Sequence, residues 1–333
     1  MLNKFWSSLT SVLSVFFDEI KVHQTMFLNA CKSDNDELVN VLLEFSDIDP
    51  SVDDNYAIRM ASIYGHVAVV DRLLQDGGVD PSNYKNYAIR LASGKGHIAV
   101  VNRLLQDCRV DPSANDNYAI RIASENGYIA VVDRLLQDGR VDPSANNNIA
   151  IRLASRNGHV AVVDRLLQDM RVDPSVNNND AIGDASRKGH VDVVDRLLQD
   201  GTGLGKRVDP SANDNFAIRM ASRNGHVDVV DRLLQDNRTD PTTYNNESIR
   251  RASLNGHIAV VDRLLQDRRV DPSANDNYAI LLSSQNGHIT VVDRLLQDDR
   301  VDPSVHDNYA IRHASENGHI AVVNRLLQEQ KTE

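Results

Sequence analysis

The chain repeats one short pattern of apolar and polar residues every 31 positions along most of its length. In the second copy, Ile58 and Ala61 fall three positions apart, which places them on one face of a short helix. We expect Asp54 or Asn55 to cap this helix by accepting a backbone N–H. Gly65 is expected to end it, because the residue after a helix often needs the left-handed conformation that glycine adopts cheaply.

A second helix follows the glycine. Val67, Val70 and Leu74 lie on one stripe and Val69 and Leu73 lie beside it, so its apolar face is wide enough to pack on several neighbours. The Leu-Leu pair recurs in ten copies, and we expect all twenty leucines to be buried. Isolated helices this short are marginal in water, so packing between adjacent copies must supply the stability.

Prolines and glycines follow the same register. All nine prolines come directly after an aspartate, and they are 31 residues apart except for one interval of 36. The glycine between the two helices shows the same spacing and precedes His in eight copies and Tyr128 in one, while Asp34 replaces it in the first copy. The Asp-Pro pairs predict turns. A fixed period of this length indicates stacked supersecondary units, and it overrules the prior of about two domains that 333 residues give.

The copies resemble the ankyrin repeat, whose pattern is T-P-L-H-x-A-A-x-x-G-H-x-x-V-V-x-x-L-L-x-x-G. Here the corresponding residues 56–77 read Y-A-I-R-M-A-S-I-Y-G-H-V-A-V-V-D-R-L-L-Q-D-G. The resemblance implies an all-α ankyrin-repeat solenoid of stacked helix-turn-helix units with short hairpin or turn fingers. The period of 31 rather than 33 implies a finger shortened by two residues. The glycine after the second helix is replaced in some copies, where we expect a different helix cap; these residues are Cys108, Met170, Arg268 and Asp299.

The pattern divides the chain into residues 1–23 and an ankyrin-repeat domain of ten repeats at 24–333, with an insertion at 201–206. The first 23 residues form an amphipathic helical stripe, namely Phe5, Leu9, Val12, Phe16 and Ile20. We expect this segment to pack on the first repeat as a cap; docking to a membrane or a partner is the alternative. The insertion is interpreted as a tolerated surface loop, with a partner contact as the alternative.

Composition and net charge limit the ligands and the cellular compartment that we expect. The 41% apolar and 25% charged residues are ordinary for a globular protein, and a net charge of −11 argues against a nucleic-acid-binding surface. Two cysteines, Cys31 and Cys108, indicate a reducing intracellular compartment. We expect an intracellular, cytoplasmic protein, or one in a host cytoplasm if the origin is viral or bacterial, since similarly uniform ankyrin arrays occur in giant viruses and intracellular bacteria.

Repeated histidines and arginines suggest chemistry that the repeat geometry argues against. Equivalent histidines of repeats stacked about 8–10 Å apart cannot converge on one zinc ion, so we expect each to bond a backbone carbonyl of the neighbouring repeat. Arginines form two ladders, one that includes Arg59 and a second that includes Arg72. Every arginine of the second ladder directly follows an Asp or Asn. We therefore expect salt-bridged surfaces rather than a nucleic-acid-binding stripe. The sequence contains no G-x-S-x-G, H-E-x-x-H or Walker A motif. We therefore predict no enzyme activity, cofactor or metal.

Positions at which the copies differ are the candidates for partner binding. Tyrosines are favoured interface anchors because they bury a large area with few rotors, and the resemblance places Tyr64, Tyr84 and Tyr87 on the concave face formed by fingers and first helices. The predicted partner-binding residues are Tyr64, Tyr84, Tyr87, Tyr118, Tyr128, Asp180 and Asp184. For tyrosines that repeat in register, such as Tyr87 and Tyr118, stacking between repeats is the alternative.

These observations predict a monomeric protein-interaction scaffold or adaptor that uses the concave face of the solenoid. The alternative is an adaptor tethered to a membrane through residues 1–23. The hypothesis of an enzyme has the least support. We expect a protein partner and no nucleic-acid ligand. The partner itself is not encoded in any motif.

Overall fold

The computed structural model describes residues 21–45, 47–199 and 208–329, and these residues form helices joined by turns, with no strand among them. A helical run covers residues 21–32. The helices that follow are α2 (Asp36–Leu42), α3 (Val52–Tyr64), α4 (Val67–Leu74), α5 (Asn83–Lys95), α6 (Ile98–Leu104), α7 (Ala114–Glu125), α8 (Ile129–Leu136), α9 (Ala145–Arg156), α10 (Val160–Leu167), α11 (Val176–Lys188), α12 (Val191–Gln199), α13 (Ala212–Asn224), α14 (Val227–Leu234), α15 (Thr243–Leu254), α16 (Ile258–Leu265), α17 (Ala274–Gln285), α18 (Ile289–Leu295), α19 (Val305–Glu316) and α20 (Ile320–Glu329). The predicted all-α class is confirmed.

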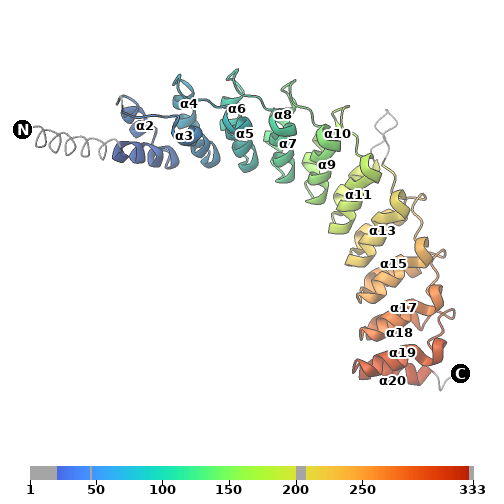
Figure 1. Ribbon diagram of the computed structural model, residues 1–333. Helices are drawn as coiled ribbons and strands as arrows, with labels where there is room; N and C mark the ends of the chain where they lie inside the picture. The colour runs from blue at the N-terminus through green and yellow to red at the C-terminus, as the bar shows by residue number, and fades with distance from the viewer. Residues whose placement is uncertain (1–20, 46, 200–207, 330–333) are drawn as a thin grey trace, which may run out of the picture. The chain divides into compact units, whose positions relative to one another are not determined.

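The chain forms two compact units, residues 1–150 and 151–333. In the first unit α3 packs on α5 and α5 on α7, while α4 packs on α6 and α6 on α8, so that one row of helices lies beside the other (Figure 1). The second unit repeats this arrangement, with α11, α13, α15, α17 and α19 in one row. We call the surface made by the odd-numbered helices and the turns that begin them the first-helix face.

The core is built from fewer leucines than the pattern predicts. The first leucine of each pair is buried, as Leu73 is, but the second ranges from 7% exposed at Leu74 to 42% at Leu327. The expectation of twenty equally buried leucines is therefore wrong. Val67, placed on the buried stripe, is 40% exposed, whereas Val69 is fully buried with Leu73. The second helix packs through the face centred on Val69 and Leu73, and Val67 lies at its margin.

The glycine between the two helices adopts the left-handed conformation in every copy, with φ of 84° at Gly65, and Asp34 in the first copy follows it with φ of 56°. The histidine of the next repeat lies against it. His97 donates from Nε2 to the carbonyl oxygen of Ile63 at 3.0 Å, and equivalent bonds recur at His66, His190, His226, His257, His288 and His319. The predicted histidine–carbonyl contact between neighbouring repeats is confirmed.

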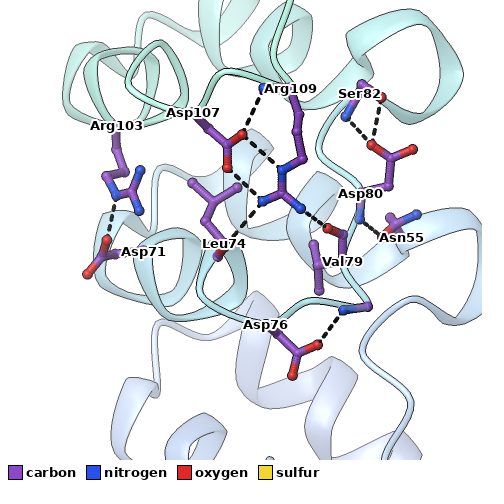
Figure 2. Close-up of polar contacts among 11 residues, drawn as sticks. Asn55, Asp71, Leu74, Asp76, Val79, Asp80, Ser82, Arg103, Asp107 and Arg109 are labelled. Atoms are coloured by element: carbon purple, nitrogen blue, oxygen red, sulfur yellow. Dashed lines mark hydrogen bonds and ion pairs between the residues drawn. The ribbon is translucent and has the colours of Figure 1, made fainter.

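The segment that connects one repeat to the next is a compact turn, and no hairpin is present in the parts of the chain that the structure describes. Asp80 accepts hydrogen bonds on Oδ1 from the backbone N and the Oγ of Ser82, at 2.9 and 2.6 Å (Figure 2). Tyr84, Lys85 and Asn86 then take left-handed conformations in succession, with φ between 50° and 58°. This left-handed turn recurs at the start of the first helix of every later repeat that the structure describes.

The predicted capping role of Asp54 and Asn55 is wrong. Asn55 is the last residue of the left-handed turn, and its Oδ1 accepts a 2.7 Å hydrogen bond from the backbone N of Asp80 in the next repeat (Figure 2). The Asp54 carboxylate accepts one from the Tyr84 hydroxyl at 2.8 Å. Both side chains therefore join neighbouring repeats instead of capping their own helix.

An Asp-x-Arg motif follows the second helix in place of a left-handed glycine. The sequence predicts a different cap where Cys108 and its counterparts replace the glycine, and the motif also occurs at Gly139, where the glycine is kept. Asp107 accepts from the backbone N and Nε of Arg109, and the guanidinium also donates to the carbonyl oxygens of Val79 and Leu74, at 2.7 and 3.2 Å (Figure 2). Its hydrogen bond to the carboxylate holds the pKa of Asp107 below the usual range. The bond from arginine to aspartate in this clamp recurs at Arg140, Arg171, Arg238, Arg269 and Arg300. Of these, Arg140, Arg238, Arg269 and Arg300 also donate to a carbonyl oxygen of the preceding repeat.

The ladder of arginines before each Leu-Leu pair forms ion pairs between repeats. Arg103 donates from Nε to Asp71 at 2.5 Å, and Arg263 and Arg294 repeat the contact with Asp231 and Asp262. These side chains are partly exposed. The predicted salt-bridged surface is confirmed, and the pairs link repeats rather than turns of one helix.

The predicted N-terminal helix lies outside the described residues up to position 20, as does the insertion at 201–206. The helical run at 21–32 passes through the predicted boundary after residue 23, and His23 lies 3.0 Å from the Asp47 carboxylate of the first repeat. Cys31 is buried and Cys108 exposed, and both are free thiols. None of the described helices combines the length and the apolar character needed to cross a membrane.

Candidate functional site

Tyrosine and arginine side chains alternate along the first-helix face of residues 1–150. Tyr and Arg occupy positions i and i+3 of each first helix, so both point to the same face. The Arg90 Cζ lies 5.0 Å from the ring centroid of Tyr87 and 4.6 Å from that of Tyr118, within the range of a cation–π contact. We call this series the tyrosine–arginine ladder; it comprises Tyr56, Arg59, Tyr87, Arg90, Tyr118 and Arg121.

The left-handed turns hold the ladder arginines in place. Arg59 donates from Nη2 to the carbonyl oxygen of Asp53 at 2.8 Å, and Arg90 donates from Nη1 to that of Tyr84 at 3.2 Å. In each case the carbonyl belongs to the turn that begins the same helix, five or six residues before the arginine. The ladder is therefore a preorganised surface, in which each guanidinium is fixed between aromatic rings and backbone carbonyls.

In residues 151–333, carboxylates replace some rings of the ladder. Arg152 contacts Asp180 at 3.1 Å, and Arg219 contacts Glu247 at 2.6 Å with both side chains only 12–13% exposed. Burial works to raise the pKa of Glu247, but hydrogen bonds from Arg219 and Arg251 outweigh it and lower the pKa. Asp180, predicted to bind a partner, thus occupies the position of a ladder tyrosine and pairs with an arginine of the preceding repeat.

The sixth repeat departs furthest from the pattern. Gly183 stands at the ladder-arginine position and is buried, and a Cβ there would come within 2.9 Å of the Phe216 ring. Asp184, the second predicted acidic residue, forms an ion pair with Arg187 on its own helix. The ring of Phe216 therefore takes up the space that a ladder arginine would occupy.

The other predicted tyrosines lie in three different settings. Tyr64 at the end of α3 is 54% exposed and stacks on His66 with ring centroids 5.9 Å apart. Tyr84 on the left-handed turn is 55% exposed, and its hydrogen bond to Asp54 raises its pKa. Tyr128 replaces the repeat histidine and lies against Gly96. Tyr64 and Tyr84 are thus open to a partner, whereas Tyr128 packs between repeats.

Sequence reasoning missed Tyr244, which is the counterpart of Tyr84. It is also 55% exposed, and its hydroxyl donates to Asp214 at 2.7 Å. The register alone could have revealed it, since Asp54 and Asp214 hold the same position in their repeats. It also missed Leu281, whose importance depends on the shape of the surface around it.

Two grooves on the first-helix face lie at positions where a single copy carries a smaller residue. One groove, of about 270 Å³, lies between α5 and α7 at Gly94, with Tyr87 and Tyr118 among its walls and Leu91 and Ile122 beneath. A larger groove, of about 380 Å³, lies between α17 and α19. It is lined by Asn275, Asp276, Tyr278, Leu281, His306, Tyr309 and Arg312.

The described residues hold no group of three His, Cys, Asp or Glu that could bind a metal ion. The serines of the Ala-Ser pairs, such as Ser62 and Ser93, are fully buried. What the first-helix face offers is aromatic, cationic and acidic groups in fixed positions beside open grooves. This arrangement can recognise side chains of another macromolecule.

Comparison with known protein families finds ankyrin repeats along the chain. The family model for ankyrin repeats in sets of three copies matches residues 27–117, 119–209, 154–245, 182–276 and 249–333. These ranges cover nearly all of the chain. No curated protein matches it.

Proposed function

Because the chain belongs to the ankyrin-repeat family, whose members generally serve as protein–protein interaction modules, we propose that it is a scaffold or adaptor that binds a partner protein through its first-helix face. The proposal includes that the chain is monomeric, intracellular and without catalytic activity. Its mechanism is recognition by a surface that is already ordered before binding, so that little conformational freedom is lost.

The observation that carries the proposal is the groove at Gly94. Leu91, Ile122 and the rings of Tyr87 and Tyr118 line it and suit an apolar side chain of a partner, while Arg90, Lys95 and Asn126 add polar groups to its lining. The tyrosine rings are fixed by Arg90, which lies between them. A groove with rigid aromatic walls is the type of pocket in which interface hot spots form.

Exposed residues next to this groove widen the proposed surface. Tyr64 and Tyr84 are exposed, at the end of α3 and in the left-handed turn that begins α5. The Tyr84 hydroxyl is anchored on Asp54, so its ring is presented in one orientation. An anchored aromatic ring binds with a smaller entropic cost than a free one.

The test compares partner capture by the full chain with capture by two double variants. Tyr87→Ala/Tyr118→Ala removes both walls of the groove, and Gln75→Ala/Gln106→Ala changes two exposed positions just after the second helices. We expect proximity labelling and purified pull-downs to identify a partner whose affinity falls about tenfold or more in the tyrosine variant only, a loss typical of one hot spot. Equal capture by all three proteins, with circular dichroism showing intact folds, would refute this site.

A further inference from the structure

We call each ladder arginine, with the tyrosine rings beside it, a rung of the tyrosine–arginine ladder. In the ninth repeat the arginine of one rung is missing. Tyr278 and Tyr309 occupy the ladder-tyrosine positions of α17 and α19, but the residue between them is Leu281 instead of arginine. The neighbouring rungs are intact, because Arg250 lies 5.7 Å from the Tyr278 ring and Arg312 lies 5.5 Å from the Tyr309 ring. The ladder position that follows Tyr278 and precedes Tyr309 therefore carries no guanidinium.

The 380 Å³ groove occupies this position. Tyr278 and Tyr309 form its walls, and Leu281, 6% exposed, lies beneath. Asn275 and Asp276 also line it. They stand six and five residues before Leu281, and in the intact rung at Arg90 the residues six and five before the arginine supply the carbonyl oxygens that accept from the guanidinium.

A missing arginine does not by itself open a groove. At Gly183 the ladder arginine is also absent, but the Phe216 ring fills the space, and a cavity of only about 10 Å³ is left. At Leu281 the space stays open as the groove lined by Tyr278 and Tyr309, and the Tyr309 ring packs on His313 of its own helix with ring centroids 3.8 Å apart. The chain thus preserves the surroundings of a guanidinium while lacking the guanidinium itself.

We propose that this groove receives an arginine side chain of a partner protein, which completes the ladder. The proposal deepens the proposed function, on which it rests. The guanidinium would lie between the rings of Tyr278 and Tyr309, as Arg90 lies between Tyr87 and Tyr118, and would donate to the carbonyl oxygens of Asn275 and Asp276.

Arginine fits this groove better than other cations. Its planar group stacks on rings and donates in several directions at once, whereas lysine presents a compact ammonium. The Asp276 carboxylate, 80% exposed and 3.7 Å from His306 Nε2, adds negative charge at the mouth. Arg312 also lines the groove and lies 5.5 Å from the Tyr309 ring. In the intact ladder Arg90 and Arg121 lie 4.6 and 5.4 Å from the same Tyr118 ring, so the ladder already accommodates two guanidinium groups at one tyrosine.

The test uses two short peptides, acetyl-Gly-Gly-Arg-Gly-Gly-amide and its citrulline counterpart, which keeps the shape of arginine but not the charge. We expect the arginine peptide to bind the full chain in the millimolar range or tighter, and about tenfold more tightly than the citrulline peptide. Leu281→Arg should abolish this binding by filling the groove from within. Thr290→Arg, which adds the same charge at an exposed position of α18, should leave it unchanged.

Leu281→Arg is expected to fold, since seven other repeats carry arginine at this position, and thermal unfolding checks this. Tyr309→Ala supplies a second variant that should weaken arginine binding about tenfold. Equal affinity for the two peptides, no binding at millimolar concentration, or binding unchanged in Leu281→Arg would each overturn the inference. None of these results bears on whether the Tyr87→Ala/Tyr118→Ala variant loses its partner, so the two proposals can fail separately.

Discussion

The imidazole of His97 lies so close to Gly65 that a Cβ added to the glycine would come within 2.6 Å of Nδ1. The same ring donates a 3.0 Å hydrogen bond from Nε2 to the carbonyl oxygen of Ile63. Gly65 is therefore needed for two reasons: its φ of 84° is costly for any residue with a side chain, and its bare Cα provides the space for a histidine of the next repeat. Gly65 therefore both ends its own helix and allows the contact with the next repeat.

Replacing this glycine should destabilise the array strongly. Gly65→Ala combines left-handed strain of about 1–2 kcal/mol with the displacement of His97, and we expect a total loss of about 2–4 kcal/mol. Gly77→Ala is the control, because Gly77 has no positive φ and nothing within 4 Å of an added Cβ. It should change stability by less than about 0.5 kcal/mol in urea unfolding. Similar midpoints for the two variants would contradict this account of the repeat interface.

The left-handed turn should depend on its last asparagine. Asn86, buried with φ of 58°, accepts from the backbone N of Asp111 at 2.7 Å. Asn86→Gly keeps the backbone conformation but leaves that N–H without its partner, which should cost about 1–3 kcal/mol. Asn86→Ala should cost about 1–2 kcal/mol more because alanine resists the left-handed region. The comparison separates the hydrogen bond from the strain, and an alanine variant as stable as the glycine variant would show that strain is negligible here.

Features set by local backbone chemistry could be predicted from the sequence. The glycine stop, the histidine contact and the buried first leucine of each pair follow from a strict repeat, since a residue that recurs at every interface must fit the same neighbours. The role of Asn55 could not be predicted in this way. A polar residue before a helix suggests a cap, and only the packed repeats show that its side chain reaches Asp80, 25 residues later.

The grooves could not be predicted for a different reason. Gly183 and Leu281 both replace a ladder arginine, and the repeat pattern alone does not say which of the two leaves an open space. Phe216 closes the space at Gly183, whereas the neighbours of Leu281 leave theirs open. Whether a substitution creates a site depends on the side chains of the adjacent repeat, which a pattern read one repeat at a time does not include.

The Asp-x-Arg clamp should contribute more to stability than the ion pairs between second helices. Arg109 donates to two backbone carbonyls of the preceding repeat and to Asp107, whose side chain is only 11% exposed. Lysine cannot reproduce this set of bonds, so we expect Arg109→Lys to cost about 1–2 kcal/mol. Arg103→Lys keeps a charge beside the partly exposed Asp71 and should cost less than about 1 kcal/mol. Urea unfolding of both variants decides this, and an equal or larger loss for Arg103→Lys would reverse the ranking.

Acid should unfold the array through the aspartates of these clamps. Hydrogen bonds from arginine lower the pKa of Asp107, Asp138, Asp169, Asp267 and Asp298 in the folded chain. In the unfolded chain the aspartates have a pKa of about 3.9, so the unfolded chain binds more protons in acid than the folded chain does. The stabilisation is complete above the unfolded pKa and is lost as the pH falls through the lower folded values. Urea midpoints should accordingly be level near neutral pH and fall steeply below about pH 4. Asp107→Asn should lower the urea midpoint at neutral pH. It should also reduce the further fall of the midpoint in acid, because one of the carboxylates with a lowered pKa is gone. A variant whose midpoint falls with pH as steeply as that of the unaltered chain would show that the clamp does not carry this dependence.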